Sequence, residues 1–275
     1  TGPGTTARHA GMQGDADAMR LADRVFVVTG AGSGIGREIS IRFAAEGAKI
    51  AAVDLRADTA AQTVSMLAGT GHYSGAVDVS SGPSVVETFA AVDRRFGRVD
   101  GLVNNAGVDH VPGDGRDLLM KTGQQTIHMS DEGFTKLMAI NVNGVFFCLR
   151  EAVKLMQRDK RPGVVINMSS IAGLGPNGNV SYAASKHAVL GITRATAREL
   201  GRFGIRVNAI CPGVIDTPMT AGVPEFALAP LKQATPLGRT GTPTDIAQTA
   251  VFLASDESSF ITGQWISPNG GLVMC

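Results

Sequence analysis

The chain has 275 residues, of which 44% are hydrophobic and 18% charged, and its formal net charge is +1. This composition is that of a folded globular protein and excludes a disordered one. A nearly neutral chain offers no electrostatic attraction to nucleic acid or to an anionic membrane surface. No apolar run approaches the ~18 residues that a membrane-spanning helix needs. We therefore expect neither a nucleic-acid nor a membrane partner.

Cysteine and histidine are sparse and scattered. The three cysteines, Cys148, Cys211 and Cys275, are far apart and form no CxxC pair, which favours a reducing compartment. We expect a cytoplasmic protein without disulfides. None of the five histidines has the spacing of a metal site, so no metal centre is predicted.

Apolar segments alternate with amphipathic ones along the chain. Residues 1–20 have no apolar period and are expected to be a flexible extension, and residues 21–275 a single domain. The predicted strands are 25–29, 49–54, 73–77, 99–103, 164–168, 205–210 and 264–267. The predicted helices are 35–46, 56–68, 81–96, 131–158, 180–203 and 243–254. Such alternation predicts an α/β domain with a doubly wound parallel sheet of the Rossmann type.

A glycine-rich turn follows the first predicted strand. The residues from Thr29 to Gly36 read TGAGSGIG and lead directly into a helix. Pyrophosphate binds backbone amides at a helix N-terminus, where side chains would block its approach. We predict that Gly30 makes the turn, Gly34 admits a dinucleotide, and Gly36 lets helix and strand pack closely. The P-loop pattern GxxxxGK[ST] and the hydrolase elbow GxSxG are both missing.

An acidic residue, Asp54, ends the second predicted strand. A carboxylate at this place accepts hydrogen bonds from the adenosine ribose and repels a 2′-phosphate. We therefore predict NAD as the cofactor in preference to NADP. Arg56 lies nearby and leaves open the alternative of a clamp for the 2′-phosphate.

Tyr182 and Lys186 are four residues apart within a predicted helix, so their side chains share one face. A phenol with an ordinary pKa near ~10 is a poor base at neutral pH, and this pKa must fall by roughly 2–3 units for it to work there. A neighbouring ammonium and a cationic nicotinamide ring both favour the phenolate. Tyr182 is therefore the candidate general acid/base.

Polar residues follow several predicted strands at the edge where open α/β sheets bind ligands. Ser169 and Ser170 follow the fifth strand, the run 104–107 (NNAG) follows the fourth, and the run 212–217 (PGVIDT) follows the sixth. A serine at such an edge can hydrogen-bond a substrate oxygen and hold it against Tyr182.

These motifs, in this order, resemble those of the short-chain dehydrogenase/reductases in their single-domain form. The matching runs are TGxxxGxG at 29–36, NNAG at 104–107, YxxxK at 182–186 and PG at 212–213, and the resemblance covers about residues 21–274. The family's serine usually stands 13 residues before its tyrosine, a spacing that Ser169 has. The local pattern NxSSxxG instead places Ser170 in the catalytic position, and we prefer Ser170.

The resemblance implies a set of roles. Tyr182 would act as general acid/base, Ser170 would orient the substrate oxygen, and Lys186 would hold the nicotinamide ribose and lower the pKa of the phenol. Asn141 would hold a water that relays protons from Lys186 to solvent. The implied cofactor-binding set is Gly30, Ser33, Gly34, Ile35, Gly36, Asp54, Leu55, Asp78, Val79, Asn104, Ala106, Gly107, Tyr182, Lys186, Pro212, Gly213, Ile215 and Thr217. Within it, Asp78 and Val79 would meet the adenine, Asn104 would stabilise the sheet centre, and Ile215 and Thr217 would bind the carboxamide.

Three functions remain open. The leading one is hydride transfer between NAD(H) and a secondary alcohol or ketone. The C-terminal segments 236–239, 253–257, 261–263 and 269–271 are similar to those of β-ketoacyl carrier-protein reductases, so a 3-oxoacyl thioester reductase is the alternative. Ser33 and Asp54 depart from that pattern, in which an arginine and a non-acidic residue are usual. A non-catalytic dinucleotide-binding regulator is the third hypothesis.

Two variable segments and the helix surfaces complete the expectations. The loop 108–130 is long for the family and is expected to shape the substrate pocket, while His110 and Asn177 are expected at the surface. Residues 218–235 are expected to form a mobile lid, whose Phe226 and Leu228 suggest a partly apolar substrate.

Helices 131–158 and 180–203 carry Phe146, Phe147, Ala183, Ala184 and Val189, which cannot all face one sheet. We therefore expect a homo-oligomer, the family's tetramer.

Overall fold

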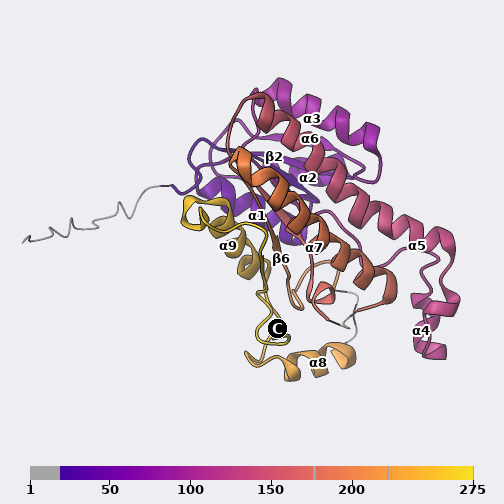
Figure 1. The fold of residues 1–275 in the computed structure, drawn as a ribbon. Helices are drawn as coiled ribbons and strands as arrows, with labels where there is room; N and C mark the ends of the chain where they lie inside the picture. The colour runs from indigo at the N-terminus through magenta and orange to yellow at the C-terminus, as the bar shows by residue number, and fades with distance from the viewer. Residues whose placement is uncertain (1–18, 176–177, 222, 224, 275) are drawn as a thin grey trace, which may run out of the picture.

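A seven-stranded parallel sheet forms the centre of the protein (Figure 1). The computed structural model describes residues 19–175, 178–221, 223 and 225–274. The strands lie in the order β3-β2-β1-β4-β5-β6-β7. Their bounds are β1 Val25–Thr29, β2 Lys49–Asp54, β3 Tyr73–Ala76, β4 Gly101–Asn104, β5 Gly163–Met168, β6 Ile205–Ile210 and β7 Trp265–Ile266. The predicted Rossmann-type architecture is confirmed.

Helices cover both faces of the sheet, so every residue of β1, β4 and β5 is buried. The helices are α1 Gly34–Ala45, α2 Ala57–Val64, α3 Gly82–Phe96, α4 Arg116–Thr122, α5 Asp131–Met138, α6 Gly144–Arg158, α7 Val180–Leu200, α8 Glu225–Ala234 and α9 Pro243–Ala254. One core layer joins the sheet to α1 and α9, around Phe26, Phe43 and Ile246. The other joins it to α3, α6 and α7, around Phe89, Leu102 and Met156.

The winding of the chain reverses at the centre of the sheet. Strand β1 lies between β2 and β4, so the chain first builds the sheet outward to β3 and then returns to continue from β4 on the other side of β1. Parallel strands that diverge in this way leave a crevice at their carboxyl ends. The ends of β1, β4, β5 and β6 meet at this crevice, which places the functional motifs together.

The structure differs from the predicted elements in several places. The helix expected over 131–158 is interrupted by a π-helical segment, Ala139–Asn143, between α5 and α6. Helix α2 ends at Val64 rather than at residue 68, and the last turn of the helix expected to residue 203 is a 3₁₀ turn, Gly201–Phe203. Helices α4 and α8 lie within segments expected to be loop and lid. Short, weakly amphipathic helices of this kind give little periodic signal.

The expected N-terminal extension falls almost wholly outside the described residues. Among the helices that the structure describes, none is long and apolar enough to cross a membrane. The same part of the chain holds no cluster of His, Cys, Asp or Glu side chains able to bind a metal ion.

Candidate active site

A cavity of about 250 Å³ lies at the carboxyl edge of the sheet. Segments from the ends of β1, β2, β4, β5 and β6 and from the start of α7 enclose it. The lining residues are 30, 33–35, 54, 105–107, 168–170, 182, 186, 212–213, 215 and 217–220. Most of the predicted site residues therefore share one cavity. Gly36, Leu55, Asp78, Val79, Asn104 and Asn141 do not line it.

The glycine turn brings the backbone close to its neighbours. Gly30 and Gly34 have φ angles of +62° and +53°, which residues with a Cβ rarely adopt. A Cβ on Gly36 would lie 2.2 Å from the carbonyl oxygen of Gly30, and one on Gly30 would lie 2.9 Å from the Cα of Ala106. The turn opens onto the N-terminus of α1, where backbone amides favour an anion. Its shape fits the pyrophosphate of a dinucleotide.

Asn105 holds this turn in place, a contact that the sequence analysis did not assign. Its Nδ2 donates to the carbonyl oxygens of Thr29 and Gly30, both at 3.1 Å. The Thr29 hydroxyl accepts from the backbone amides of Asn105 and Ala106, both at 3.1 Å. The preceding Asn104 points the other way and donates to Asn167 Oδ1 at 2.9 Å, within the sheet centre. The pair of adjacent asparagines could have predicted this contact. Successive side chains of an extended chain point to opposite sides, so Asn105 had to point away from the site of Asn104.

Asp54 lines the cavity at the end of β2. Its Oδ2 accepts from the backbone amide of Gly32 at 2.9 Å, and a Cβ on Gly32 would lie 2.8 Å from that oxygen. The carboxylate thus stands directly against the glycine turn. The side chain of Arg56 forms an ion pair with Asp58 at 2.8 Å, while Leu55 is 71% exposed and does not line the cavity.

Tyr182 and Lys186 lie on the first turns of α7. Asn179 caps the helix by accepting from the backbone amide of Tyr182 at 2.9 Å. The Nζ atom of Lys186 lies 5.5 Å from the centre of the Tyr182 ring and donates to the carbonyl oxygen of Met168 at 2.9 Å. Burial of this ammonium lowers the pKa of Lys186 to about 8.

In the protein alone, the pKa of the Tyr182 phenol is raised, not lowered. Burial is the main cause, a hydrogen bond with Ser170 opposes it, and the negative charge of Asp109 adds to it. Lys186 is not among these causes, and desolvation of the phenol dominates. A lowered pKa requires additional positive charge in the cavity.

The two candidate serines have different partners. Ser169 is buried, and its hydroxyl donates to the backbone carbonyl of Lys186 at 2.9 Å. Ser170 is hydrogen-bonded to Tyr182 and accepts from the backbone amide of Ala172 at 3.1 Å. Because a hydroxyl has one proton to donate, Ser169 is engaged by α7, whereas Ser170 faces the phenol.

Comparisons with known proteins agree with this geometry. The family model described as enoyl-(acyl carrier protein) reductase matches residues 30–273. The (3R)-3-hydroxyacyl-CoA dehydrogenase of Mus musculus is 40% identical, covering 94% of this chain and all of that protein. The 3-oxoacyl-[acyl-carrier-protein] reductase of Thermotoga maritima is also 40% identical, over 93% of this chain and all of that protein.

The fold comparison points the same way. A crystal structure of levodione reductase superposes with a TM-score of 0.83 and 35% identity, covering 92% of this chain and 98% of that one. The chain belongs to the short-chain dehydrogenase/reductase family. It is an oxidoreductase that acts on hydroxyl or keto groups and uses a nicotinamide dinucleotide. The hypothesis of a non-catalytic regulator is therefore dropped.

The family's asparagine, Asn141, lies in the π-helical segment and is buried. Its Oδ1 accepts from the backbone amide of Val108 at 2.9 Å, and its Nδ2 donates to the Val108 carbonyl at 2.8 Å and to the Ser185 hydroxyl at 3.1 Å. Its side chain thus joins the strand-β4 loop to α7. A π-helical turn, which often marks functional sites, positions it.

The remaining family residues divide into two groups. Pro212, Gly213, Ile215 and Thr217 line the cavity opposite the glycine turn, and a Cβ on Gly34 would lie 3.4 Å from Thr217 Cβ. Asp78 instead accepts from the backbone amide and hydroxyl of Ser80, at 2.9 and 2.6 Å. Val79 is buried beneath Gly144. The adenine contact expected of these two residues lies outside the described cavity.

The two variable segments are partly ordered by their own contacts. His110 is half-buried and pairs with the buried Asp114 at 2.9 Å, whereas Asn177 lies outside the described residues. Of the expected lid, residues 218–220 line the cavity. Phe226 on α8 is 72% exposed and Leu228 is half-buried, and neither lines it.

Proposed function

We propose that this enzyme interconverts a secondary alcohol and its ketone with NAD(H), with Tyr182 as the general acid/base. The observation that carries the proposal is the meeting of Tyr182, Ser170 and Lys186 in the cavity that also holds the glycine turn. When bound, the dinucleotide supplies the nicotinamide carbon that takes up or delivers the hydride.

The residues of the chain supply the proton chemistry. During oxidation, the Tyr182 phenolate accepts the proton of the substrate hydroxyl, and during reduction the phenol returns it to the carbonyl oxygen. Ser170 holds the same oxygen by a hydrogen bond, so that it stays within reach of Tyr182. The Lys186 ammonium lies beside the ring and stabilises the phenolate. Asn141 holds the water through which the proton reaches solvent.

NAD is the proposed form of the cofactor because of Asp54. Its carboxylate lies against the glycine turn, where the adenosine ribose of a bound dinucleotide belongs. A 2′-phosphate at this position would meet a negative charge. Arg56, which would have to neutralise such a phosphate, is engaged by Asp58.

The names of the relatives suggest two substrate classes. The first is a small secondary alcohol or ketone, which a relative named levodione reductase, from Leifsonia aquatica and 37% identical, illustrates. The second is a 3-hydroxyacyl or 3-oxoacyl thioester, named in the two relatives at 40% identity. A panel of secondary alcohols, ketones and acyl thioesters, each followed through NADH absorbance, separates the two classes.

We also propose a homotetramer. Its support is the apolar surface that α5 and α6 leave uncovered in the single chain, where Phe134 is 39% and Phe146 45% exposed.

The decisive test of the assignment replaces the phenol by a benzene ring. We expect Tyr182→Phe to lower kcat by about 10²–10⁴-fold, because proton transfer by a positioned side chain contributes about that much. NAD binding, followed by quenching of tryptophan fluorescence, should be nearly unchanged. Tyr73→Phe removes the other tyrosine and is the control. Full turnover in Y182F would exclude Tyr182 as the acid/base.

A further inference from the structure

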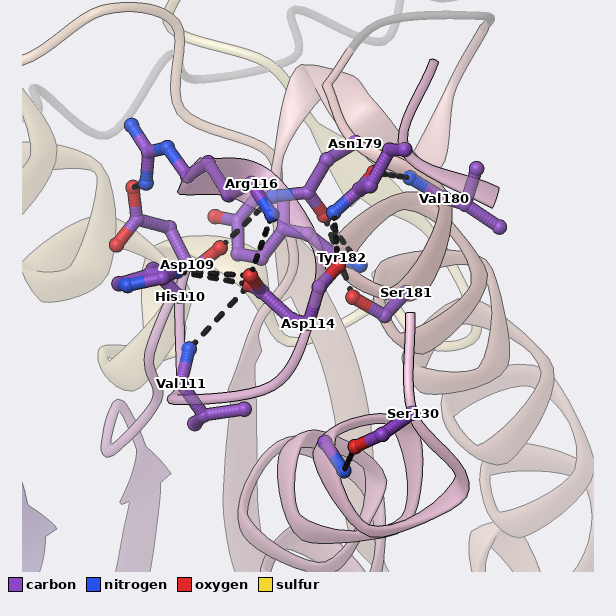
Figure 2. Close-up of polar contacts among 12 residues, drawn as sticks. Asp109, His110, Val111, Asp114, Arg116, Ser130, Asn179, Val180, Ser181 and Tyr182 are labelled. Carbon is purple, nitrogen blue, oxygen red and sulfur yellow. Dashed lines mark hydrogen bonds and ion pairs between the residues drawn. The ribbon is translucent and has the colours of Figure 1, made fainter. Parts of the chain in front are cut away.

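The segment that follows β4 is fixed on both sides of Asp109. The preceding residue, Val108, is held through both its amide and its carbonyl by Asn141, at 2.9 and 2.8 Å. The carbonyl of Asp109 itself accepts from Asn179 Nδ2 at 2.9 Å, and the Oδ1 of the same Asn179 caps Tyr182. A single amide therefore links Asp109 to the backbone of Tyr182 (Figure 2).

The carboxylate of Asp109 is paired with Arg116, whose Nη1 lies 2.6 Å from Asp109 Oδ2. Arg116 is set in place from its own backbone, because its amide donates to Asp114 Oδ1 at 2.9 Å. Asp114 is fully buried and also holds His110 and the amide of Val111. The backbone that carries the ion pair is therefore held by hydrogen bonds to the buried Asp114 (Figure 2).

The charged groups around Tyr182 are few among the described residues. Lys186 lies beside its ring on α7, the charge of Asp109 on the segment after β4 acts on the phenol, and Arg116 pairs with the Asp109 carboxylate. The ends of β5 and β6 contribute uncharged side chains to the cavity, Ser170 among them. The His110–Asp114 pair lies farther along the same segment. Asp109 is thus the anion whose field reaches the phenol.

We propose that Arg116 is a positioning residue of the active site, which holds the Asp109 carboxylate and offsets part of its charge at Tyr182. Without the guanidinium, an unpaired anion near the phenol would oppose its ionisation more strongly. The pair orients the Asp109 side chain while the Asp109 carbonyl accepts from Asn179. The importance of Arg116 for catalysis rests on the proposed function of Tyr182. The effect of residues 109 and 116 on the pKa of Tyr182 does not depend on that function.

The chain contains only two tyrosines, Tyr73 and Tyr182, which allows a direct test. In a Tyr73→Phe background, Tyr182 is the sole phenol, and its titration can be followed by ring-carbon NMR of labelled tyrosine, with and without NAD⁺. We expect Arg116→Gln to raise the Tyr182 pKa by about half a pH unit or more, and Asp109→Asn to lower it by a similar amount.

The double variant and a conservative variant complete the set. D109N/R116Q carries neither charge and should return the pKa to between those of the single variants, close to the parent protein. R116K keeps a positive charge and should also stay close to it. If R116Q leaves the titration unchanged, or moves it in the same direction as D109N, the proposal is wrong. If R116Q does not fold, the double variant decides, because without the guanidinium its Tyr182 pKa must lie above that of D109N.

The proposal and the proposed function fail in different ways. An active Y182F enzyme would exclude the catalytic assignment whatever the titrations show. An inactive Y182F together with a titration that does not respond to residues 109 and 116 would overturn only the role of Arg116. Thermal unfolding of each variant identifies changes that come from loss of the fold.

Discussion

Lys186 shows at the residue scale how the fold creates a functional pKa. Its ammonium is buried and donates to the backbone carbonyl of Met168 at 2.9 Å. Burial without a counter-ion disfavours the charged form and lowers the pKa to about 8, from 10.5 for the exposed side chain. Between these two values the unfolded chain binds more protons than the folded protein at this residue. Its contribution to stability therefore rises with pH across this window.

Replacing Lys186 by methionine removes this buried charge and tests its cost. At pH 7, we expect K186M to be more stable than the wild-type protein by about 1–2 kcal/mol, and to be inactive. The difference should shrink as the pH rises from 8 to 10. Other groups, such as Cys148, titrate equally in K186M and in the wild-type protein, so they do not contribute to the difference in stability. Urea unfolding at both pH values measures the effect, and a difference independent of pH would contradict it.

Asp54 gives a second prediction at the level of one side chain. Asp54→Asn keeps an oxygen that can accept from the Gly32 amide but removes the charge. We expect kcat/KM for NADP, relative to that for NAD, to rise about tenfold, which corresponds to ~1.4 kcal/mol. Glu87→Gln, on the exposed surface of α3, is the control for loss of one carboxylate. An unchanged cofactor preference in D54N would remove the argument for NAD.

At this scale, the sequence predicts which residues meet but not how they are bonded. The spacing of Tyr182 and Lys186 places them on one helix face, and the structure shows that arrangement. It does not distinguish Ser169 from Ser170, because the direction of each hydroxyl depends on the packing of α7 against β5. Nor does it show that Asp109 lies by the phenol, because that contact is made through Asn179, 70 residues away along the chain.

At the scale of elements, the segment between β4 and α5 depends on one buried carboxylate. Asp114 has no exposed surface and accepts hydrogen bonds from His110, Val111 and Arg116. The carbonyl of Asp114 accepts from Gln125 Nε2 at 2.8 Å, which ties the far end of the segment to it. The oxygen of the same Gln125 accepts from the amide of Val180 at the start of α7. The segment is therefore built against the helix that carries Tyr182.

We expect Asp114→Ala to loosen this segment. Several buried donors would lose their acceptor, so the free energy of unfolding should fall by about 2 kcal/mol. Amide hydrogen exchange should accelerate over residues 108–130 and around Val180. Exchange in α1 and α9, which pack on the opposite face of the sheet, should change only with global stability. Unaltered protection of the segment in D114A would show that other contacts hold it.

Element boundaries were less predictable than the elements themselves. The period of apolar residues runs through 131–158 without a break, so the π-helical turn around Asn141 leaves no trace in it. That turn adds one residue to a helical turn, and backbone contacts with Val108 accompany it. Helices α4 and α8 were missed because they are short and largely exposed, and because α8 contains Pro230.

At the scale of the whole molecule, the order of elements determines the fold. Strands buried on both faces and joined by helices admit few topologies, since crossovers are right-handed. The observed strand order is one of the few that the pattern of segments admits. The oligomeric state does not follow in this way, because the sequence shows apolar helix faces but not what covers them. The exposed Phe146 on α6, with Arg150 over its ring at 5.9 Å, is such a face.

We expect light scattering to give a particle of about four times the 28.5 kDa chain mass. A charge at the proposed interface should destabilise the assembly, so Phe146→Glu should produce smaller particles. Met66→Glu is the matched control, because Met66 is 46% exposed and Phe146 45%, and Met66 lies just after α2 on the other face of the sheet. A particle of 28.5 kDa for the unmodified protein would exclude the tetramer.

The amide of Asn179 has a consequence for how ligands and protons are coupled. It joins the Asp109 carbonyl to the Tyr182 amide, while the Asp109 carboxylate is paired with Arg116. Any molecule that draws Arg116 away from Asp109 leaves an unpaired anion near the phenol and makes the phenol less acidic. At a pH where the phenol is partly ionised, such a molecule takes up protons from the buffer as it binds, and by reciprocity its affinity increases in more acidic solution. Calorimetry in buffers with different ionisation enthalpies would count those protons.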